Sequence, residues 1–269
     1  MEKRQILLTN DDGIHSPGLW AAAEALSELG YVTVAAPRDQ ASGTGRSLPM
    51  TSDGVIRSET LRVGGREWTV YAVGGTPAQA VLHGILEIMK SKPDLVVSGI
   101  NYGENVASGI TISGTVGAAM EAASQGIPAL ATSLETDRSH HLTYSTEVDF
   151  STAAYFTAFF ARKILETRFP ADVDLWKLDV PSDATRQTPW QVTRLAHQRY
   201  FAAVKPKRDS WEQRGPVDYQ EAAILEGEDK DSDVIVLRVG RRVSLTPLSL
   251  DLTARVPLGE LERLLRSDD

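Results

Sequence analysis

The stretch "QILLTNDDGIHSPGLWAAAEALSELGYVTVAAP" (residues 5–37) decides the fold. Its first part, "QILLTN", reads as a short buried strand. Ser16 followed by Pro17 is typical of a helix start, and apolar residues then recur at helical spacing until Gly30. "YVTVAAP" predicts a second strand. A strand, a helix and a strand in this order predict a parallel strand pair joined by a right-handed crossover.

The same alternation continues downstream, which favours a doubly wound α/β domain. We expect further strands at 94–101, 127–134 and 173–181, helices at 76–89, 113–126 and 145–168, and an extended or hairpin insertion at 42–70. Beyond residue 182 the pattern changes to short alternating runs, which are typical of hairpins. These runs lie at 190–195, 200–204, 233–239 and 242–248, and a terminal helix is expected at 258–266.

This change in pattern predicts two parts in the chain. Residues 1–181 would form the α/β catalytic domain with a mostly parallel sheet. Residues 182–269 would form a smaller β-rich extension whose hairpins and amphipathic final helix suit subunit association.

Composition excludes several classes of protein. The net charge is −8, so the chain is a poor partner for a nucleic-acid duplex or an anionic membrane. The absence of cysteine excludes disulfide frameworks, cysteine zinc sites and thiol nucleophiles. The first residues contain only a short apolar run, far from a signal peptide or a membrane helix. We therefore expect a soluble, cytoplasmic protein.

Polar loops follow three of the expected strands. They are "NDDG" (10–13), "RDQASGTGRS" (38–47) and "NYGEN" (101–105). In open α/β sheets, ligands bind beyond the carboxyl ends of the strands, and parallel strands bring these ends to one edge. The three loops are therefore expected to meet at a single site.

The adjacent carboxylates of Asp11 and Asp12 would repel each other at that edge unless a cation lay between them. Together with the side-chain oxygens of Ser42 and Asn101 they form an all-oxygen set, which hard cations such as Mg²⁺, Mn²⁺ or Ca²⁺ prefer. The alternative is an ordinary Asp-Asp-Gly turn in which Asp12 only stabilises nearby backbone N–H groups.

Ser113, Gly114 and Thr115 open an expected helix, where free N–H groups and a partial positive charge suit a phosphate. The alternative is that Ser113 is only an N-cap. The glycine-rich "SGTGRS" (42–47) matches neither the dinucleotide-binding pattern nor the P-loop pattern.

Several ordered segments together resemble the SurE family, the metal-dependent survival-protein-E phosphatases. They are "TNDDGIHSPGL", "APRDQASGTGRS", "GGTPAQAV", "VSGINYGENV" and "ISGTVGAAMEAASQGIPALATS", with "VSLTPLSLDLT" (243–253) near the end. The resemblance covers most of residues 5–135 and a stretch near 230–253.

The resemblance implies a 5′-nucleotidase that hydrolyses nucleoside 5′-monophosphates with one divalent metal per subunit, Mg²⁺ or Mn²⁺. It also implies a Rossmann-like catalytic domain whose C-terminal extension exchanges between subunits, giving a homodimer or a homotetramer. The implied metal ligands are Asp11, Asp12, Ser42 and Asn101. The implied phosphate contacts are Ser113, Gly114 and Thr115, and the implied catalytic residues are Asp11, Asp12 and Asn105.

The chain departs from the family pattern at four positions, none of them an implied metal ligand. They are Gln40, Ala41, Gln79 and Asp179, the last standing where the family often has asparagine. These departures leave open the base preference and any exopolyphosphatase activity.

Two other readings of the site remain. A haloacid-dehalogenase-type phosphatase also carries an aspartate after its first strand, but it needs an Asp-x-Asp spacing, whereas Asp11 and Asp12 are adjacent. A non-catalytic nucleotide-binding module would keep the phosphate cradle without needing a metal.

Overall fold

The backbone of the protein is organised by one large sheet. The computed structural model describes residues 3–141, 143–197, 199–224 and 226–266, and within them nine strands form this sheet. Strand β1 (Arg4–Thr9) lies in the interior between β2 (Gly30–Pro37) and β5 (Leu95–Tyr102). Outside β2 come β4 (Arg66–Val73) and β3 (Ile56–Val63). Outside β5 come β6 (Ala129–Leu134), β7 (Leu175–Val180), β11 (Val243–Leu248) and β8 (Trp190–Val192).

Most neighbouring strands in the sheet are parallel. The exceptions are the β3–β4 hairpin and the antiparallel pairing of β11 with β7. The parallel run β4-β2-β1-β5-β6-β7 brings the carboxyl ends of six strands to one edge. This confirms the predicted mostly parallel α/β sheet.

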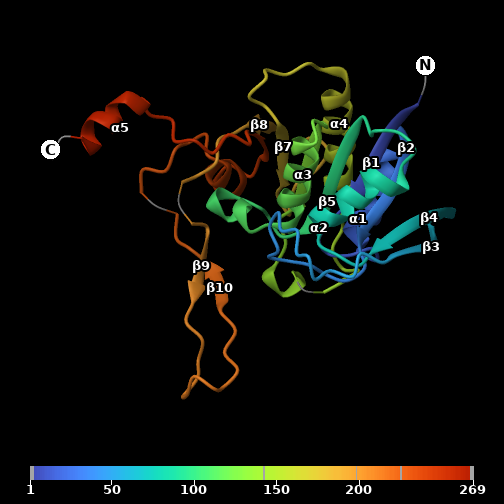
Figure 1. Cartoon of the computed structure of the whole chain (residues 1–269), viewed down its shortest axis with the longest axis horizontal. Helices are drawn as coiled ribbons and strands as arrows, with labels where there is room; N and C mark the ends of the chain where they lie inside the picture. Colours follow the sequence, from blue (N-terminus) through green and yellow to red (C-terminus); the bar gives the residue numbers. More distant parts are fainter. Residues whose placement is uncertain (1–2, 142, 198, 225, 267–269) are drawn as a thin grey trace.

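Helices cover both faces of the sheet (Figure 1). Leu8 belongs to the hydrophobic cluster shared with α1 (Pro17–Leu26) and α4 (Ser151–Glu166). Its neighbour Leu7 belongs to the cluster on the opposite face, shared with α2 (Pro77–His83) and α3 (Gly114–Ser124). Because successive strand residues point to opposite faces, β1 needs apolar residues throughout. None of the described helices combines the length and apolar character that a membrane span requires.

The shorter helical segments lie in the connections. The π-helical turn η1 (Gly84–Ile88) continues α2, while the 3₁₀ turns η2 (Ala107–Thr111) and η3 (Arg138–His140) follow β5 and β6. The expected helix at 145–168 begins only at Ser151, whose backbone N–H is accepted by the Asp149 carboxylate at 2.8 Å. The expected insertion at 42–70 contains the β3–β4 hairpin, which joins the edge of the main sheet.

The strand expected at 233–239 is wrong. These residues form a π-helical turn, η4 (Ile235–Val239). At its start the Ser232 and Asp233 side chains accept the backbone N–H groups of Ile235 and Val234. Val234 and Leu237 are fully buried and pack against the Val106 region. All but two of the residues 233–239 are apolar, and in a segment this short the spacing of the polar residues does not separate a helical turn from a strand.

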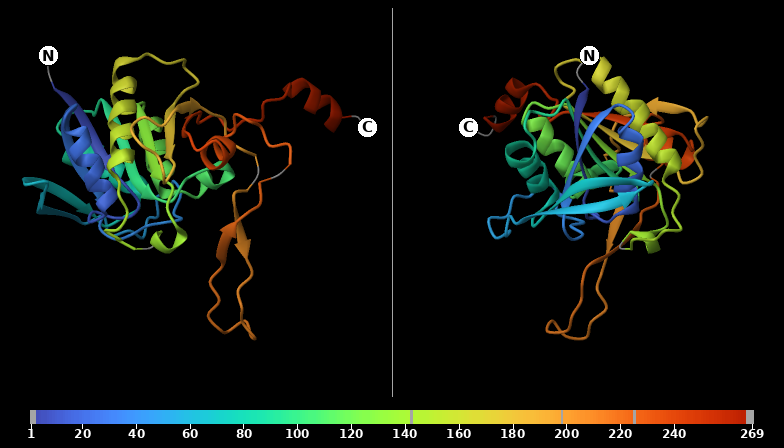
Figure 2. Two further views of the ribbon diagram at one scale, coloured as in Figure 1. Left: turned by 180° about the vertical axis from the view of Figure 1, so that it is seen from behind. Right: turned by 90° about the vertical axis from the view of Figure 1, so that its right-hand side faces the viewer.

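The region after residue 182 contributes both to the sheet and to projecting segments. β8 and β11 extend the main sheet, whereas β9 (Phe201–Val204) and β10 (Asp218–Glu221) pair only with each other. This hairpin projects well away from the sheet in both views of Figure 2. The expected terminal helix is present as α5 (Leu258–Leu265), and it stands apart from the body of the protein (Figure 1).

The contact between α1 and β5 depends on a glycine. A Cβ added at Gly18 would lie 2.1 Å from the carbonyl oxygen of Ile100, well inside van der Waals contact. Only glycine therefore lets the first turn of α1 approach the end of β5 this closely. This approach brings the start of α1 close to the strand end that carries Asn101.

We expect Gly18→Ala to destabilise the protein by about 1 to 3 kcal/mol, because overpacking outweighs alanine's better helix propensity. The matched control is Gly259→Ala, also at the second position of a helix, where an added Cβ would meet nothing within 4 Å. Urea unfolding measures both variants. Equal stability of Gly18→Ala and the parent would show that this contact is not tight.

Candidate metal and phosphate site

The two aspartates that follow β1 are buried at the carboxyl edge of the sheet. Asp11 is 4% exposed and Asp12 is 1% exposed. Asn10 fixes the turn that carries them, because its side chain donates to the Gly13 carbonyl at 3.0 Å and accepts from the Gly13 N–H at 3.1 Å. Among the described residues, neither aspartate pairs with a lysine, arginine or histidine. The carboxylates therefore lie in a low-dielectric site without an internal cation.

Asp11 faces the N-terminus of α3. The Thr115 hydroxyl donates to Asp11 Oδ1 at 2.5 Å. A Cβ added at Gly114 would lie 2.7 Å from the Asp11 Cβ, so glycine is required for this approach. Burial raises the pKa of Asp11, while hydrogen bonds from Thr115 and Gly114 oppose the rise. The predicted phosphate cradle and the predicted metal ligand are thus brought together.

Ser113 is the N-cap of α3, as the alternative to a phosphate contact predicted. Its hydroxyl accepts the backbone N–H of Val116 at 3.1 Å. The cap uses the N–H of Val116, while the N–H groups of Gly114 and Thr115 face the Asp11 carboxylate, so this helix start already holds one anionic group.

Asp12 is held by three other loops. Its carboxylate accepts the Gln40 side-chain amide at 3.2 Å and the Tyr102 backbone N–H at 3.4 Å. The Tyr144 hydroxyl donates to its backbone carbonyl at 2.8 Å. Burial, together with the neighbouring Asp11 carboxylate, raises the pKa of Asp12 well above its usual range. Such a carboxylate would gain from a bound cation.

Asn101 lies at the end of β5, and Ser42 lies on the loop that follows β2 at the same edge of the sheet. The Asn101 amide nitrogen donates to the carbonyls of Tyr102 at 3.0 Å and Gly103 at 2.7 Å, which leaves its oxygen as the free end. Ser42 is exposed and follows Ala41, whose N–H donates to the Asp11 carbonyl at 2.7 Å. Carboxylate, amide and hydroxyl oxygens form the donor set that a hard dication prefers.

Asn105 is also on this edge and is fixed by two contacts. Its backbone N–H donates to Asp179 Oδ1 at 2.8 Å, and its side-chain amide donates to the Ser133 hydroxyl at 2.8 Å. The preceding Glu104 is 4% exposed, and burial raises its pKa to about 7.

The sequence analysis did not assign two residues that contact Asp12, Gln40 and Tyr144. Gln40 lies inside a loop that was singled out, so its polar side chain was a usable signal. Tyr144 reaches Asp12 from a segment more than a hundred residues away, and nothing in the sequence indicated that contact.

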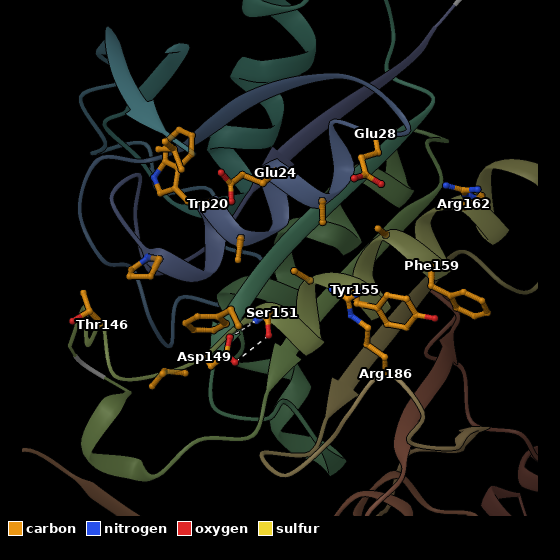
Figure 3. A pocket seen from close by; sticks show the side chains of 18 of the residues that line it. Trp20, Glu24, Glu28, Thr146, Asp149, Ser151, Tyr155, Phe159, Arg162 and Arg186 are labelled. Atoms are coloured by element: carbon orange, nitrogen blue, oxygen red, sulfur yellow. Dashed lines mark hydrogen bonds between the residues drawn. The ribbon is translucent and has the colours of Figure 1, made fainter. Parts of the chain in front are cut away.

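A large cleft elsewhere in the molecule is separate from this edge. It has a volume of about 1140 Å³, lies between α1 and α4, and is lined by none of the predicted site residues. Figure 3 shows Glu24 from α1 and Glu28 just after this helix, with Tyr155, Phe159 and Arg162 from α4.

The raised pKa values predict a stability effect in the metal-free protein. A carboxyl whose pKa is raised on folding loses stability as pH rises above its unfolded pKa, because folding then opposes ionisation. We expect Asp12→Asn to stabilise the protein in EDTA at pH 8, because it removes a buried charge that no neighbouring cation compensates. The gain should shrink towards pH 4.

Thermal unfolding in EDTA across this pH range measures the effect. The exposed Asp209→Asn is the control and should change stability by less than about 0.5 kcal/mol. If Asp12→Asn were less stable than the parent at pH 8, the Asp12 carboxylate could not be a buried charge without compensation.

Comparison with known proteins places this geometry in a family. The family model "Survival protein SurE" matches residues 6–202. A "5′-nucleotidase SurE" from Thermococcus gammatolerans is 42% identical over 97% of this chain and 96% of its own length. Its counterpart from Methanocella arvoryzae is 41% identical over 98% of both chains. The crystal structure of the SurE protein from Aquifex aeolicus superposes with a TM-score of 0.74 at 32% identity, covering 98% of this chain and 100% of that one.

These full-length similarities favour neither the haloacid-dehalogenase reading nor the non-catalytic module. The family generally depends on a divalent metal, in agreement with the carboxylate, amide and hydroxyl oxygens at this edge of the sheet. The chain belongs to the SurE family.

Proposed function

We propose that this protein is a divalent-metal-dependent 5′-nucleotidase that hydrolyses nucleoside 5′-monophosphates to nucleoside and phosphate. The relatives that match nearly the whole chain carry the name 5′-nucleotidase. The observation that carries the proposal is the contact between Asp11 and the start of α3, made by Thr115 at 2.5 Å. This contact places the buried carboxylates of Asp11 and Asp12 beside a helix N-terminus that suits an anion.

The phosphate would lie at the N-terminus of α3. The backbone N–H groups there, two of which face the Asp11 carboxylate, and the partial positive charge of the helix suit its oxygens. Ser113, Gly114 and Thr115 would provide these contacts, and the Asn105 amide would approach from the β5 loop. Donors fixed before the substrate arrives stabilise developing charge without reorganisation.

One divalent ion per subunit, Mg²⁺ or Mn²⁺, would be held by Asp11, Asp12, Asn101 and Ser42. The evidence for this set is the buried carboxylate pair, its raised pKa values and the free amide oxygen of Asn101. When bound, the ion supplies positive charge against the phosphoryl oxygens.

Asp11 would act on the attacking water. As a carboxylate it would accept a proton from that water. The Thr115 hydroxyl fixes Oδ1 and so orients the carboxylate. Direct attack of Asp11 on phosphorus is the alternative route, and acid quenching would trap the aspartyl-phosphate that only this route forms.

We also propose that the protein forms a homodimer or a homotetramer through the region after residue 182. α5 stands clear of the body and places Leu258, Leu261 and Leu265 at i, i+3 and i+7 spacing, all exposed (Figure 1). A helix with an exposed apolar stripe gains stability by packing it against another surface. The division at residues 181 and 182 and the location in the cytoplasm stay predictions.

Asp11→Asn should reduce phosphate release from AMP by about 100-fold or more, because it removes the proposed proton acceptor. EDTA should abolish release, and added Mn²⁺ should restore it. A malachite-green assay measures the phosphate, and circular dichroism checks the fold. The exposed Asp209→Asn is the matched control.

Near-normal turnover of Asp11→Asn with Mn²⁺ would contradict the assignment of Asp11. A parent protein that binds AMP by calorimetry but releases no phosphate with any of several divalent metals would instead be a nucleotide-binding module.

Leu261→Glu should shift the protein towards monomer, because it places a charge in the apolar stripe of α5. Sedimentation velocity measures the change, and Glu260→Gln on the same helix is the control. An unchanged sedimentation coefficient would show that α5 does not hold the subunits together.

A further inference from the structure

A buried lysine with two buried aspartates lies directly behind the Asn105 loop. Lys177, Asp179 and Asp233 are each 0% exposed. The Lys177 ammonium contacts Asp179 and lies 3.1 Å from Asp233 Oδ2. Although burial lowers it, the pKa of Lys177 is raised overall by the two carboxylates. Removing three charged groups from water is expensive, so the cluster calls for a reason beyond stability.

The cluster has two carboxylates but only one ammonium, and backbone N–H groups stabilise the remaining negative charge. Asp179 Oδ1 accepts the N–H of Asn105 at 2.8 Å. Asp233 Oδ2 accepts the N–H of Ala107 at 2.9 Å, and its Oδ1 accepts those of Ala196 and Val234, both at 2.9 Å. Each of the four carboxylate oxygens therefore has a partner, and two of these partners are N–H groups of one short loop.

Asn105 is one of the two points at which that loop is attached. Asp179 holds it at Asn105, Asp233 holds it at Ala107, and Lys177 ties the two aspartates together. Ala107 adopts a φ of 55°, a left-handed conformation that residues other than glycine rarely take. The side chain of Asn105 is then held by Ser133 on the adjacent strand β6.

We infer that Lys177, Asp179 and Asp233 form a positioning cluster that holds the Asn105 amide at the phosphate site and links it to the region after residue 182. The inference rests on the proposed phosphate contact of Asn105. The cluster itself touches no substrate.

The link to the C-terminal region runs through Asp233. It contacts Ala196 and Val234 on one side and the Asn105 loop on the other. Packing of Val234 and Tyr200 with Val106 and Ala107 strengthens the same junction. The geometry of Asn105 therefore depends on residues that follow the main run of parallel strands.

The main test is the double variant Lys177→Met/Asp179→Leu, which removes one acceptor together with its cation and leaves Asp233 with its N–H partners. We expect kcat/KM for AMP to fall by about 100-fold, the scale of loss that a misplacement of roughly 1 Å produces. The inhibition constant of inorganic phosphate should rise. Hydrogen exchange at the amides of Asn105 and Ala107 should accelerate.

Two further variants separate positioning from folding. Asp179→Asn keeps an acceptor oxygen for Asn105 and leaves the Lys177–Asp233 pair balanced, so it should retain kcat/KM within about 5-fold of the parent. Asp179→Glu keeps the charge but moves the carboxylate by one methylene, so it should lower kcat/KM while remaining folded. It serves as the test if the double variant does not fold.

Leu178→Ala is the structural control. Leu178 lies between Lys177 and Asp179 on β7, is fully buried, and faces the α1/α4 cluster. It should lower the melting temperature and leave KM, phosphate inhibition and amide exchange at Asn105 unchanged. An equal effect of Leu178→Ala on KM would reject a specific positioning role.

A double-mutant cycle with Asn105→Ala decides whether the cluster acts through Asn105. If it does, adding Lys177→Met/Asp179→Leu to Asn105→Ala should lower kcat/KM by less than about a further 3-fold, because the effects of residues that act as a unit are not additive. Fully additive losses would overturn the inference. Near-normal turnover of Asn105→Ala alone would reject the proposed phosphate contact. Unchanged amide exchange in the double variant would reject the cluster's hold on the loop.

Discussion

The free energy of burying Asp11 and Asp12 side by side is the constraint around which this protein is built. The sheet brings both carboxylates out of water, and no cationic side chain among the described residues compensates them. The surrounding groups act as donors instead: the Thr115 hydroxyl, the Gln40 amide and the Tyr102 N–H. A carboxylate pair in such surroundings would be stabilised by a cation from outside, as the proposed metal site requires.

The molecule uses buried aspartates in two opposite ways. Asp179 and Asp233 are closed off, with Lys177 and four backbone N–H groups occupying their oxygens. Asp11 and Asp12 keep unneutralised charge at the edge of the sheet. The same type of side chain is thus fully paired in one place and lacks a cationic partner in the other, where we propose that it binds a metal ion.

Much of this arrangement was predictable from the sequence because it follows local rules. The apolar strand before Asp11, the Ser113 cap and the polar loops after three strands all carry period or capping signals. The strand wrongly expected at 233–239 and the contact of Tyr144 with Asp12 had no such signal. The Lys177 cluster joins residues more than fifty positions apart, so only the tertiary fold could reveal it.

The antiparallel strand β11 has a consequence for how the chain is made. It pairs with both β7 and β8, although it follows β7 by some sixty residues in the sequence. During synthesis on the ribosome, the outer edge of β7 must therefore wait, with its hydrogen-bonding groups unpaired, until β11 emerges. Such an edge invites pairing with other nascent chains. β11, the last strand to be synthesised, thus covers the edge of β7 and protects the sheet from aggregation.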